Sequence, residues 1–274
     1  MLIDYHVHNR FSPDSEEDTR KIIEKATELG INEVCITNHP ESHSGDTGED
    51  AFDLNEAKER FGKIKKELDT VQQEYPDIRI RFGIELGYHE KRMDQLTELV
   101  SETDFDFVLG SVHVVKGVVI PSHLFADDFY SKTDEKTAYG AYFTEMMKLI
   151  RWGQLDVVAH FDICKKHGHK FYGPFRPEKY KDQILPILKL MSQKNIGLEL
   201  NTACMESKCR EVFPHPLILK WAASTGVRHF TIGSDAHKAK NVGRFIPKAM
   251  EIAKEAGITQ LSTYRKRKPA LHPF

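Results

Sequence analysis

Residues 2–8 of the chain read LIDYHVH, an apolar run at 2–5 that leads into two histidines with one residue between them. Because side chains alternate along a strand, His6 and His8 would point to the same side. Six further apolar runs, rich in Val, Ile, Leu and Phe, lie at 33–37, 78–86, 107–112, 155–159, 196–200 and 229–233. Short runs of this kind are typical of strands that are buried on both faces.

Amphipathic stretches with helical spacing separate these runs, at 15–29, 52–75, 91–101, 135–152, 180–194, 216–224 and 242–255. The first opens with Ser15 and acidic residues and stops before Gly30, as a capped helix does. Strand and helix alternating seven times predicts parallel strands joined by crossover helices, which most simply close into a TIM-like barrel. We therefore expect an α/β fold with residues 1–274 in one domain. An open doubly wound sheet is the alternative, but no glycine-rich nucleotide loop follows the first run.

The composition excludes several classes of protein. The chain has 274 residues, with 39 Lys and Arg against 41 Asp and Glu, and a formal net charge of -2. This balance argues against a basic nucleic-acid groove. No run approaches the roughly 20 apolar residues of a membrane span, and the first residues lack a signal-peptide pattern. The four cysteines form no C-x-x-C pair, so we expect free thiols and a cytoplasmic location.

Potential metal ligands end six of the seven apolar runs. In a parallel barrel these ends meet at one mouth, where barrel enzymes place their chemistry, and the long polar segments 40–51 and 116–133 would be loops there. Imidazoles and carboxylates suit divalent Zn, Fe or Mn. Nine candidates are too many for one ion and are enough for two or three. They are His6, His8, Asp14, His39, Glu85, His113, His160, Asp235 and His237.

A single histidine on a strand is more often a hydrogen-bonded core residue than a ligand, but six strand ends with the same property favour a polynuclear metal site. Such a site can activate a hydroxide as a nucleophile at neutral pH, and this predicts hydrolysis. Ester or amide hydrolysis by a dinuclear barrel enzyme remains an alternative. A non-catalytic metal-binding module is an alternative of another class, although structural metal sites are often rich in thiolates.

The same blocks resemble the polymerase and histidinol phosphatase (PHP) family. They are HVH at 6–8, TNH at 37–39, GSVH at 110–113 and SDAH at 234–237, with GIE at 83–85 and AHFD at 159–162 between them in the expected order. The resemblance covers nearly the whole chain and is greatest to the histidinol-phosphate phosphatases. It implies a distorted (β/α)7 barrel and hydrolysis of a small phosphate monoester, histidinol phosphate, in L-histidine biosynthesis. A nuclease or nucleotidase of the same family is the alternative.

The resemblance also implies how three metal ions would be held. His6, His8, Glu85 and Asp235 would hold the first ion, and Glu85 would bridge to a second ion completed by His113 and His160. The third ion would be held by Asp14, His39 and His237.

Substrate contacts are less directly indicated. Related histidinol-phosphate phosphatases tend to carry Arg where Lys165 stands, and another Arg shortly after the Asn-Thr pair, where this chain has MES at 205–207. Lys binds phosphate as a point charge and Arg as a planar fork. Lys165, Lys208 and Arg210 are our candidates for phosphate binding. Candidates for protonating the leaving group are His43, Asp162 and His215, and the sequence does not choose among them.

Overall fold

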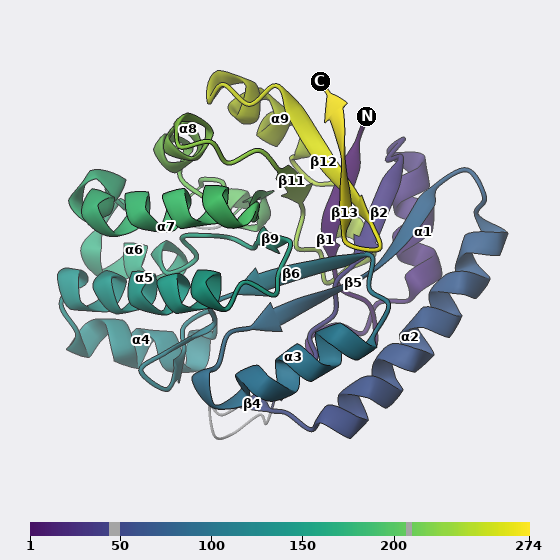
Figure 1. Ribbon diagram of the computed structural model, residues 1–274, viewed down its shortest axis with the longest axis horizontal. Coiled ribbons are helices and arrows are strands. Elements are labelled where there is room, and N and C mark those ends of the chain that lie inside the picture. Colours follow the sequence, from purple (N-terminus) through teal and green to yellow (C-terminus); the bar gives the residue numbers. More distant parts are fainter. Residues whose placement is uncertain (44–49, 207–209) are drawn as a thin grey trace.

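Seven parallel strands form the centre of the computed structural model, which describes residues 1–43, 50–206 and 210–274 (Figure 1). Neighbouring strands pair in the order β1-β2-β5-β6-β9-β10-β11. Every pair is parallel. Their bounds are β1 (Ile3–Val7), β2 (Glu33–Ile36), β5 (Arg79–Gly87), β6 (Phe107–Ser111), β9 (Val157–Val158), β10 (Gly197–Asn201) and β11 (Phe230–Gly233).

The sheet curls until its two edges meet. A parallel bridge joins Val7, at the end of β1, to Ala236, just after β11. His8 N donates to Ala236 O at 2.9 Å, and Asp235 N donates to His6 O at 2.8 Å. The sheet is thus nearly closed as a barrel, which confirms the predicted TIM-like fold and rules out the open doubly wound alternative.

Helices surround the barrel, and most match the predicted amphipathic stretches (Figure 1). Predicted and observed bounds agree at both ends for α5 and α8. The helix predicted from Ser15 begins instead at Thr19, because Asp18 caps it by accepting from Arg20 N. The helices are α1 (Thr19–Glu28), α2 (Leu54–Glu74), α3 (Met93–Glu102), α4 (His123–Lys132), α5 (Glu135–Trp152), α6 (Lys165–Tyr172), α7 (Lys181–Lys194), α8 (Pro216–Ser224) and α9 (Ile246–Glu255).

Two of the predicted loops contain regular structure. Segment 116–133 carries strand β8 (Val118–Val119), which pairs with β7 (Val114–Val115), and then helix α4, so its prediction as an irregular loop is wrong. The helix is held by tertiary packing, since Tyr130 is buried and its hydroxyl donates to Cys164 O at 2.9 Å. Segment 40–51 carries the short strands β3 (Ser42–His43) and β4 (Asp50–Ala51), and residues 44–49 lie outside the described residues.

A C-terminal hairpin, β12 (Gln260–Arg265) and β13 (Lys268–Pro273), closes the amino-terminal end of the barrel. Tyr264 N donates to the hydroxyl of Tyr5 at 2.7 Å. Arg267 pairs with Asp156, which immediately precedes β9, at 3.1 Å. This leaves the opposite, carboxyl-terminal end of the strands as the end where a site can form.

Cys35 and Cys164 are buried free thiols, as expected, whereas Cys204 is disulfide-bonded, so the prediction of free thiols is wrong for that residue. No helix in the described part of the chain is long and apolar enough to cross a bilayer.

Candidate metal centre

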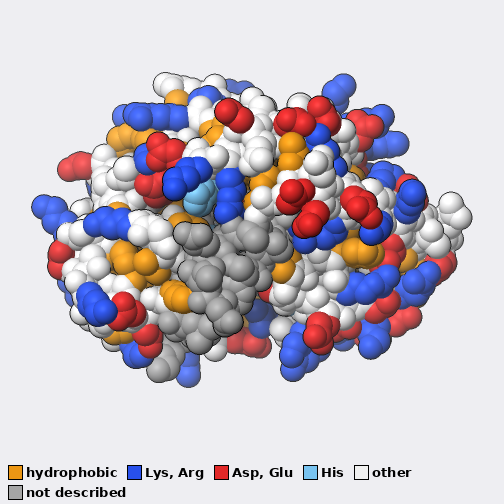
Figure 2. Space-filling view, turned by 90° about the horizontal axis from the view of Figure 1, so that it is seen from below, with side chains coloured by type: hydrophobic (Ala, Val, Ile, Leu, Met, Phe, Trp, Pro, Cys, Tyr) orange, Lys and Arg blue, Asp and Glu red, His pale blue; other side chains and the backbone are white. Residues whose placement is uncertain are grey.

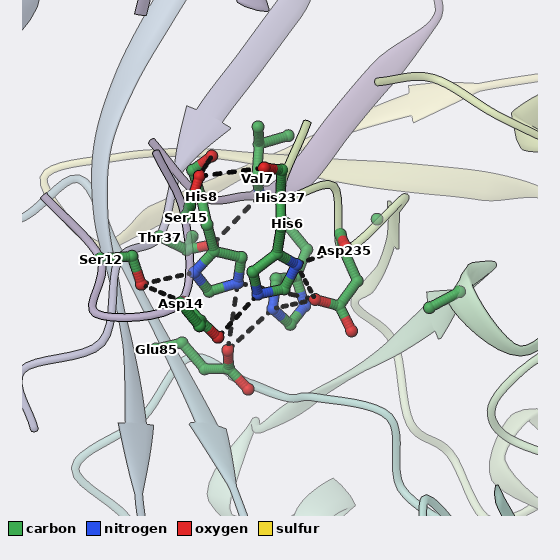
Figure 3. A network of polar contacts seen from close by, with 12 residues as sticks. His6, Val7, His8, Ser12, Asp14, Ser15, Thr37, Glu85, Asp235 and His237 are labelled. Atoms are coloured by element: carbon green, nitrogen blue, oxygen red, sulfur yellow. Dashed lines mark hydrogen bonds and ion pairs between the residues drawn. The ribbon is translucent and has the colours of Figure 1, made fainter. Parts of the chain in front are cut away.

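All nine predicted ligands lie together at the carboxyl-terminal ends of the strands. They form four overlapping groups, and within each group one potential ligand atom per residue lies within 4.8 Å of the others. Figure 3 shows several of these side chains pointing toward one another from β1, from the segment after it, from β5 and from the segment after β11. The groups are His8, Asp14, His39 and His237; His6, His8 and Asp235; His6, Glu85 and His160; and His39, Glu85 and His113.

Glu85, on β5, is at the centre of this cluster. Its Oε2 lies 2.8 Å from His6 Nε2, and its Oε1 lies 2.8 Å from His160 Nε2. Oε1 is also 3.3 Å from His113 Nε2. Burial would raise the pKa of Glu85, but the surrounding imidazoles, above all His6 and His39, hold it well below its usual value. One ionised carboxylate therefore faces imidazoles on both of its oxygens, the arrangement required of a bridging ligand.

His6 and His8 point to the same side of β1, as their spacing predicted. Asp235 Oδ1 lies 3.6 Å from the Nε2 atom of each ring. Asp235 has a left-handed backbone, with φ of 54°, a conformation that is uncommon for residues other than glycine. Buried Asp4 stabilises this turn, because its carboxylate accepts from Ser234 N at 2.8 Å and from Gly243 N at 2.8 Å.

The third part of the cluster forms where the segment after β1 folds back over the mouth. Asp14 Oδ2 lies 2.8 Å from His237 Nε2 and 3.6 Å from His39 Nε2. Ser12 orients this carboxylate by donating to Asp14 Oδ1 at 2.7 Å. Ser15, which was expected to open a helix, instead donates to the backbone oxygens of His8 and His237. The polar residues after β1 therefore shape the site rather than a helix.

The residues present fit divalent metal ions. His8 Nε2 is buried and has no hydrogen-bond partner among the described residues, a state that is costly unless the atom has some other ligand. Burial and the neighbouring His237 lower the pKa of His8 to about 4, so its ring is neutral and can donate a lone pair to a metal. Imidazoles with carboxylates are the ligand set that zinc, iron and manganese accept.

The candidate substrate-binding residues lie in different environments. Lys165 is buried rather than exposed to a ligand: its Nζ donates to Asp162 Oδ2 at 3.0 Å and to Val212 O at 2.8 Å. Nζ also lies 3.2 Å from Glu211 Oε2. Arg210 is exposed. Lys208 and the side chain of His43 lie outside the described residues.

Asp162 and His215 are neighbours beside the cluster. Asp162 is fully buried, and its Oδ2 accepts from His215 N at 2.8 Å. His215 caps α8, where its Nδ1 accepts from Leu217 N at 3.1 Å. The same histidine lines a pocket of about 520 Å³ with Phe175, Arg176, Pro177, Glu178 and Lys179.

Sequence reasoning missed Glu199, on β10. The prediction assigned no ligand to this strand, yet Glu199 is fully buried and its Oε1 lies 2.7 Å from His6 Nδ1. A signal was available: glutamate is almost never fully buried unless it is paired, and here it falls within a short apolar run.

Comparison with known proteins identifies the family. The PHP domain profile matches residues 4–203. The chain belongs to the PHP domain family. Among its PHP relatives is the histidinol-phosphatase of Lactococcus lactis, 30% identical over 272 residues, which cover 96% of this chain and 94% of the relative. A probable histidinol-phosphatase of Clostridium acetobutylicum is 26% identical over 94% of this chain and 95% of its own.

Solved structures of PHP proteins agree with the fold. The histidinol phosphate phosphatase of Lactococcus lactis, complexed with zinc, L-histidinol and phosphate, superposes with a TM-score of 0.86 at 25% identity, covering 98% of each chain. A putative histidinol phosphatase of Listeria monocytogenes gives a TM-score of 0.75 at 23% identity, covering 90% of this chain and 99% of its own. The predicted family is confirmed, and the clusters of this PHP protein could hold several metal ions.

Proposed function

We propose that this PHP protein is a metal-dependent phosphatase that hydrolyses L-histidinol phosphate to L-histidinol and inorganic phosphate, a step of L-histidine biosynthesis. The observation that carries the proposal is the nine-residue cluster centred on Glu85, at the carboxyl-terminal end of a PHP barrel. The substrate follows from relatives along almost the whole chain that are named for this activity, one of them solved with histidinol and phosphate.

We assign the metal-holding roles as follows. His6, His8, Glu85 and Asp235 would hold one ion, Glu85, His113 and His160 a second, and Asp14, His39 and His237 a third. His8 also falls within the Asp14 group, so it could contribute to either the first or the third site. When bound, such ions lower the pKa of coordinated water and neutralise the charge that develops on phosphoryl oxygens. We further propose that residues 1–274 form one domain.

The protein's own residues would bind and orient the substrate. Because Lys165 already faces three oxygens in a buried position, we assign phosphate contact outside the metals to Arg210 and to Lys208. Of the candidate proton donors whose side chains are described, we assign this role to His215. Its Nδ1 accepts from a backbone amide, so the neutral ring carries its proton on Nε2. Asp162 is fully buried and is assigned to positioning the backbone of His215.

A nucleic-acid substrate receives no support from the charge distribution. Figure 2 shows a face on which Lys and Arg side chains are interspersed with Asp and Glu rather than gathered into a basic groove, and the formal net charge is -2.

The test of the proposed substrate is a panel assayed with the metal-loaded protein. Release of inorganic phosphate should be measured from L-histidinol phosphate, from nucleoside monophosphates and from p-nitrophenyl phosphate, and nucleotide release from a single-stranded oligonucleotide. We expect the highest kcat/KM for L-histidinol phosphate. A higher kcat/KM for nucleotides or the oligonucleotide would contradict the proposal.

A further inference from the structure

Glu199 and Glu85 contact the same two candidate metal ligands, His6 and His160, from different sides. Glu199 Oε1 lies 2.7 Å from Nδ1 of His6, and its Oε2 accepts from the backbone N of His160 at 2.8 Å. The Nε2 atoms of the same two histidines lie 2.8 Å from the two oxygens of Glu85. Both histidines are therefore held between two carboxylates, one from β10 and one from β5.

We propose that Glu199 is a positioning residue of the metal centre, whose carboxylate fixes the ring of His6 and the backbone of His160 so that both Nε2 atoms face Glu85. This inference rests on the proposed metal centre and assigns to Glu199 no contact with a metal or with substrate.

The chemistry of the contacts sets the state of His6. An ionised carboxylate only accepts hydrogen bonds, so the Nδ1 atom of His6 must carry a proton, which leaves the Nε2 lone pair for a metal. Carboxylates that hold the second nitrogen of a metal-binding histidine in this way fix its tautomer and its orientation.

The hydrogen bond from His160 N to Glu199 stabilises a strained backbone conformation. His160 has a φ of 25°, in the left-handed region, which costs free energy unless the surroundings hold it. The hydrogen bond from His160 N to Glu199 is a contact that holds this conformation. Glu199 thus supports one histidine through its ring and the other through its main chain.

The neighbouring strand leaves room for this arrangement. Gly233, on β11, is paired beside Asn201, and a Cβ at this position would lie 2.3 Å from Glu199 Oε1 and 2.4 Å from His6 Cβ. Any larger residue at 233 would push the carboxylate and the ring apart. Asn201 Nδ2 donates a third hydrogen bond to Glu199, to Oε2 at 3.2 Å.

The test is zinc affinity, measured by competition with a chelator, in the wild-type protein and in two variants. E199Q keeps the size of the side chain. Its amide oxygen can accept from only one of His6 and His160, and its NH2 group would face the N–H group of the other. The matched control is E33Q. Glu33 is equally buried, but it lies at the opposite end of the barrel, where it pairs with Tyr5, Arg79 and Arg81.

We expect E199Q to weaken zinc binding about 10- to 100-fold and E33Q to leave it within about twofold of the wild type while lowering the Tm. An unchanged zinc affinity in E199Q, or an equal loss in both variants, would overturn the proposal. If E199Q does not fold, ¹⁵N NMR of histidine-labelled, zinc-loaded wild-type protein decides: Nδ1 of His6 should be protonated and Nε2 metal-bound, and the reverse would overturn the proposal. A wild-type protein that binds no zinc, iron or manganese would reject the metal centre itself, whatever the variants do.

Discussion

Oε2 of Glu85 lies 2.8 Å from Nε2 of His6, and both side chains are almost completely buried. The two residues come from β5 and β1, which lie on either side of β2 in the sheet, so the contact reaches across one strand. It links the group containing His160 to the group containing His8 and Asp235. Replacing Glu85 should therefore affect more than one metal ion.

We expect E85Q to lower kcat/KM by at least about 100-fold, since loss of residues that only orient metal ligands already costs 10- to 100-fold. The metal content, measured by inductively coupled plasma mass spectrometry, should fall by more than one equivalent per chain. The far-UV circular dichroism spectrum should stay close to that of the wild type. An active E85Q protein with its full metal content would show that Glu85 is not a ligand.

Metal binding should release protons. Burial would lower the pKa of His39, but Glu85 and Asp14 raise it to about 10, and the pKa of His6 is raised well above its usual value by Glu85, Glu199 and Asp235 against the effect of burial. In the metal-free protein both rings are therefore protonated at pH 7. A metal ligand must be a neutral imidazole, so each ring loses a proton on binding.

Isothermal titration calorimetry in buffers of different ionisation enthalpy measures this release. At pH 7 we expect at least two protons to leave per fully loaded chain, and the affinity to rise with increasing pH. Heats of zinc binding that do not depend on the buffer would contradict this prediction.

Lys165 should matter for stability. K165M leaves the carboxylate of Asp162 buried without its cation, a change that typically costs about 3–5 kcal/mol in the free energy of unfolding. K65M, which removes an exposed partner of Asp69 on α2, should cost less than about 1 kcal/mol. Urea denaturation of both variants measures the difference. A K165M protein with unchanged stability and a raised KM would instead make Lys165 a phosphate contact.

Asp156 should make stability depend on pH in the opposite sense to most carboxylates. Burial raises its pKa to about 6, and Arg267 only partly counters this. Because the folded protein holds this proton more tightly than the unfolded chain, the contribution of Asp156 to stability falls as pH rises from about 4 to about 6 and is constant above that. The change amounts to on the order of 3 kcal/mol.

D156N should remove this dependence. Free energies of unfolding, measured with chelator from pH 4 to pH 8, should show the wild type losing stability relative to D156N up to about pH 6. A difference between the two proteins that does not change with pH would refute the raised pKa.

The sequence predicted most of the barrel because buried parallel strands and amphipathic helices have distinct periodicities. It also predicted the members of the cluster, since parallel strand ends converge and the ligands end the apolar runs. The structure adds how Asp14 is held, because Ser12 donates to its carboxylate and Ser15 donates to the backbone oxygen of His237.

Other features depend on tertiary contacts that no local pattern encodes. Helix α4 is stabilised by the burial of Tyr130 against the chain near Cys164, a contact with another segment. Glu199 has a local signal, its place within an apolar run, but its partners, His6 and His160, are distant in sequence and only the structure identifies them. The burial of Lys165 could not be predicted for the same reason, since its acceptors at 211 and 212 lie on a different segment.

The most direct test of the account is phosphate release from L-histidinol phosphate by one preparation before chelation, after complete metal removal and after zinc, iron or manganese is restored. We predict that activity is lost with the metal and returns as more than one equivalent per chain is bound. Full activity in the metal-free protein would contradict the proposed polynuclear centre and the hydrolytic function assigned to it.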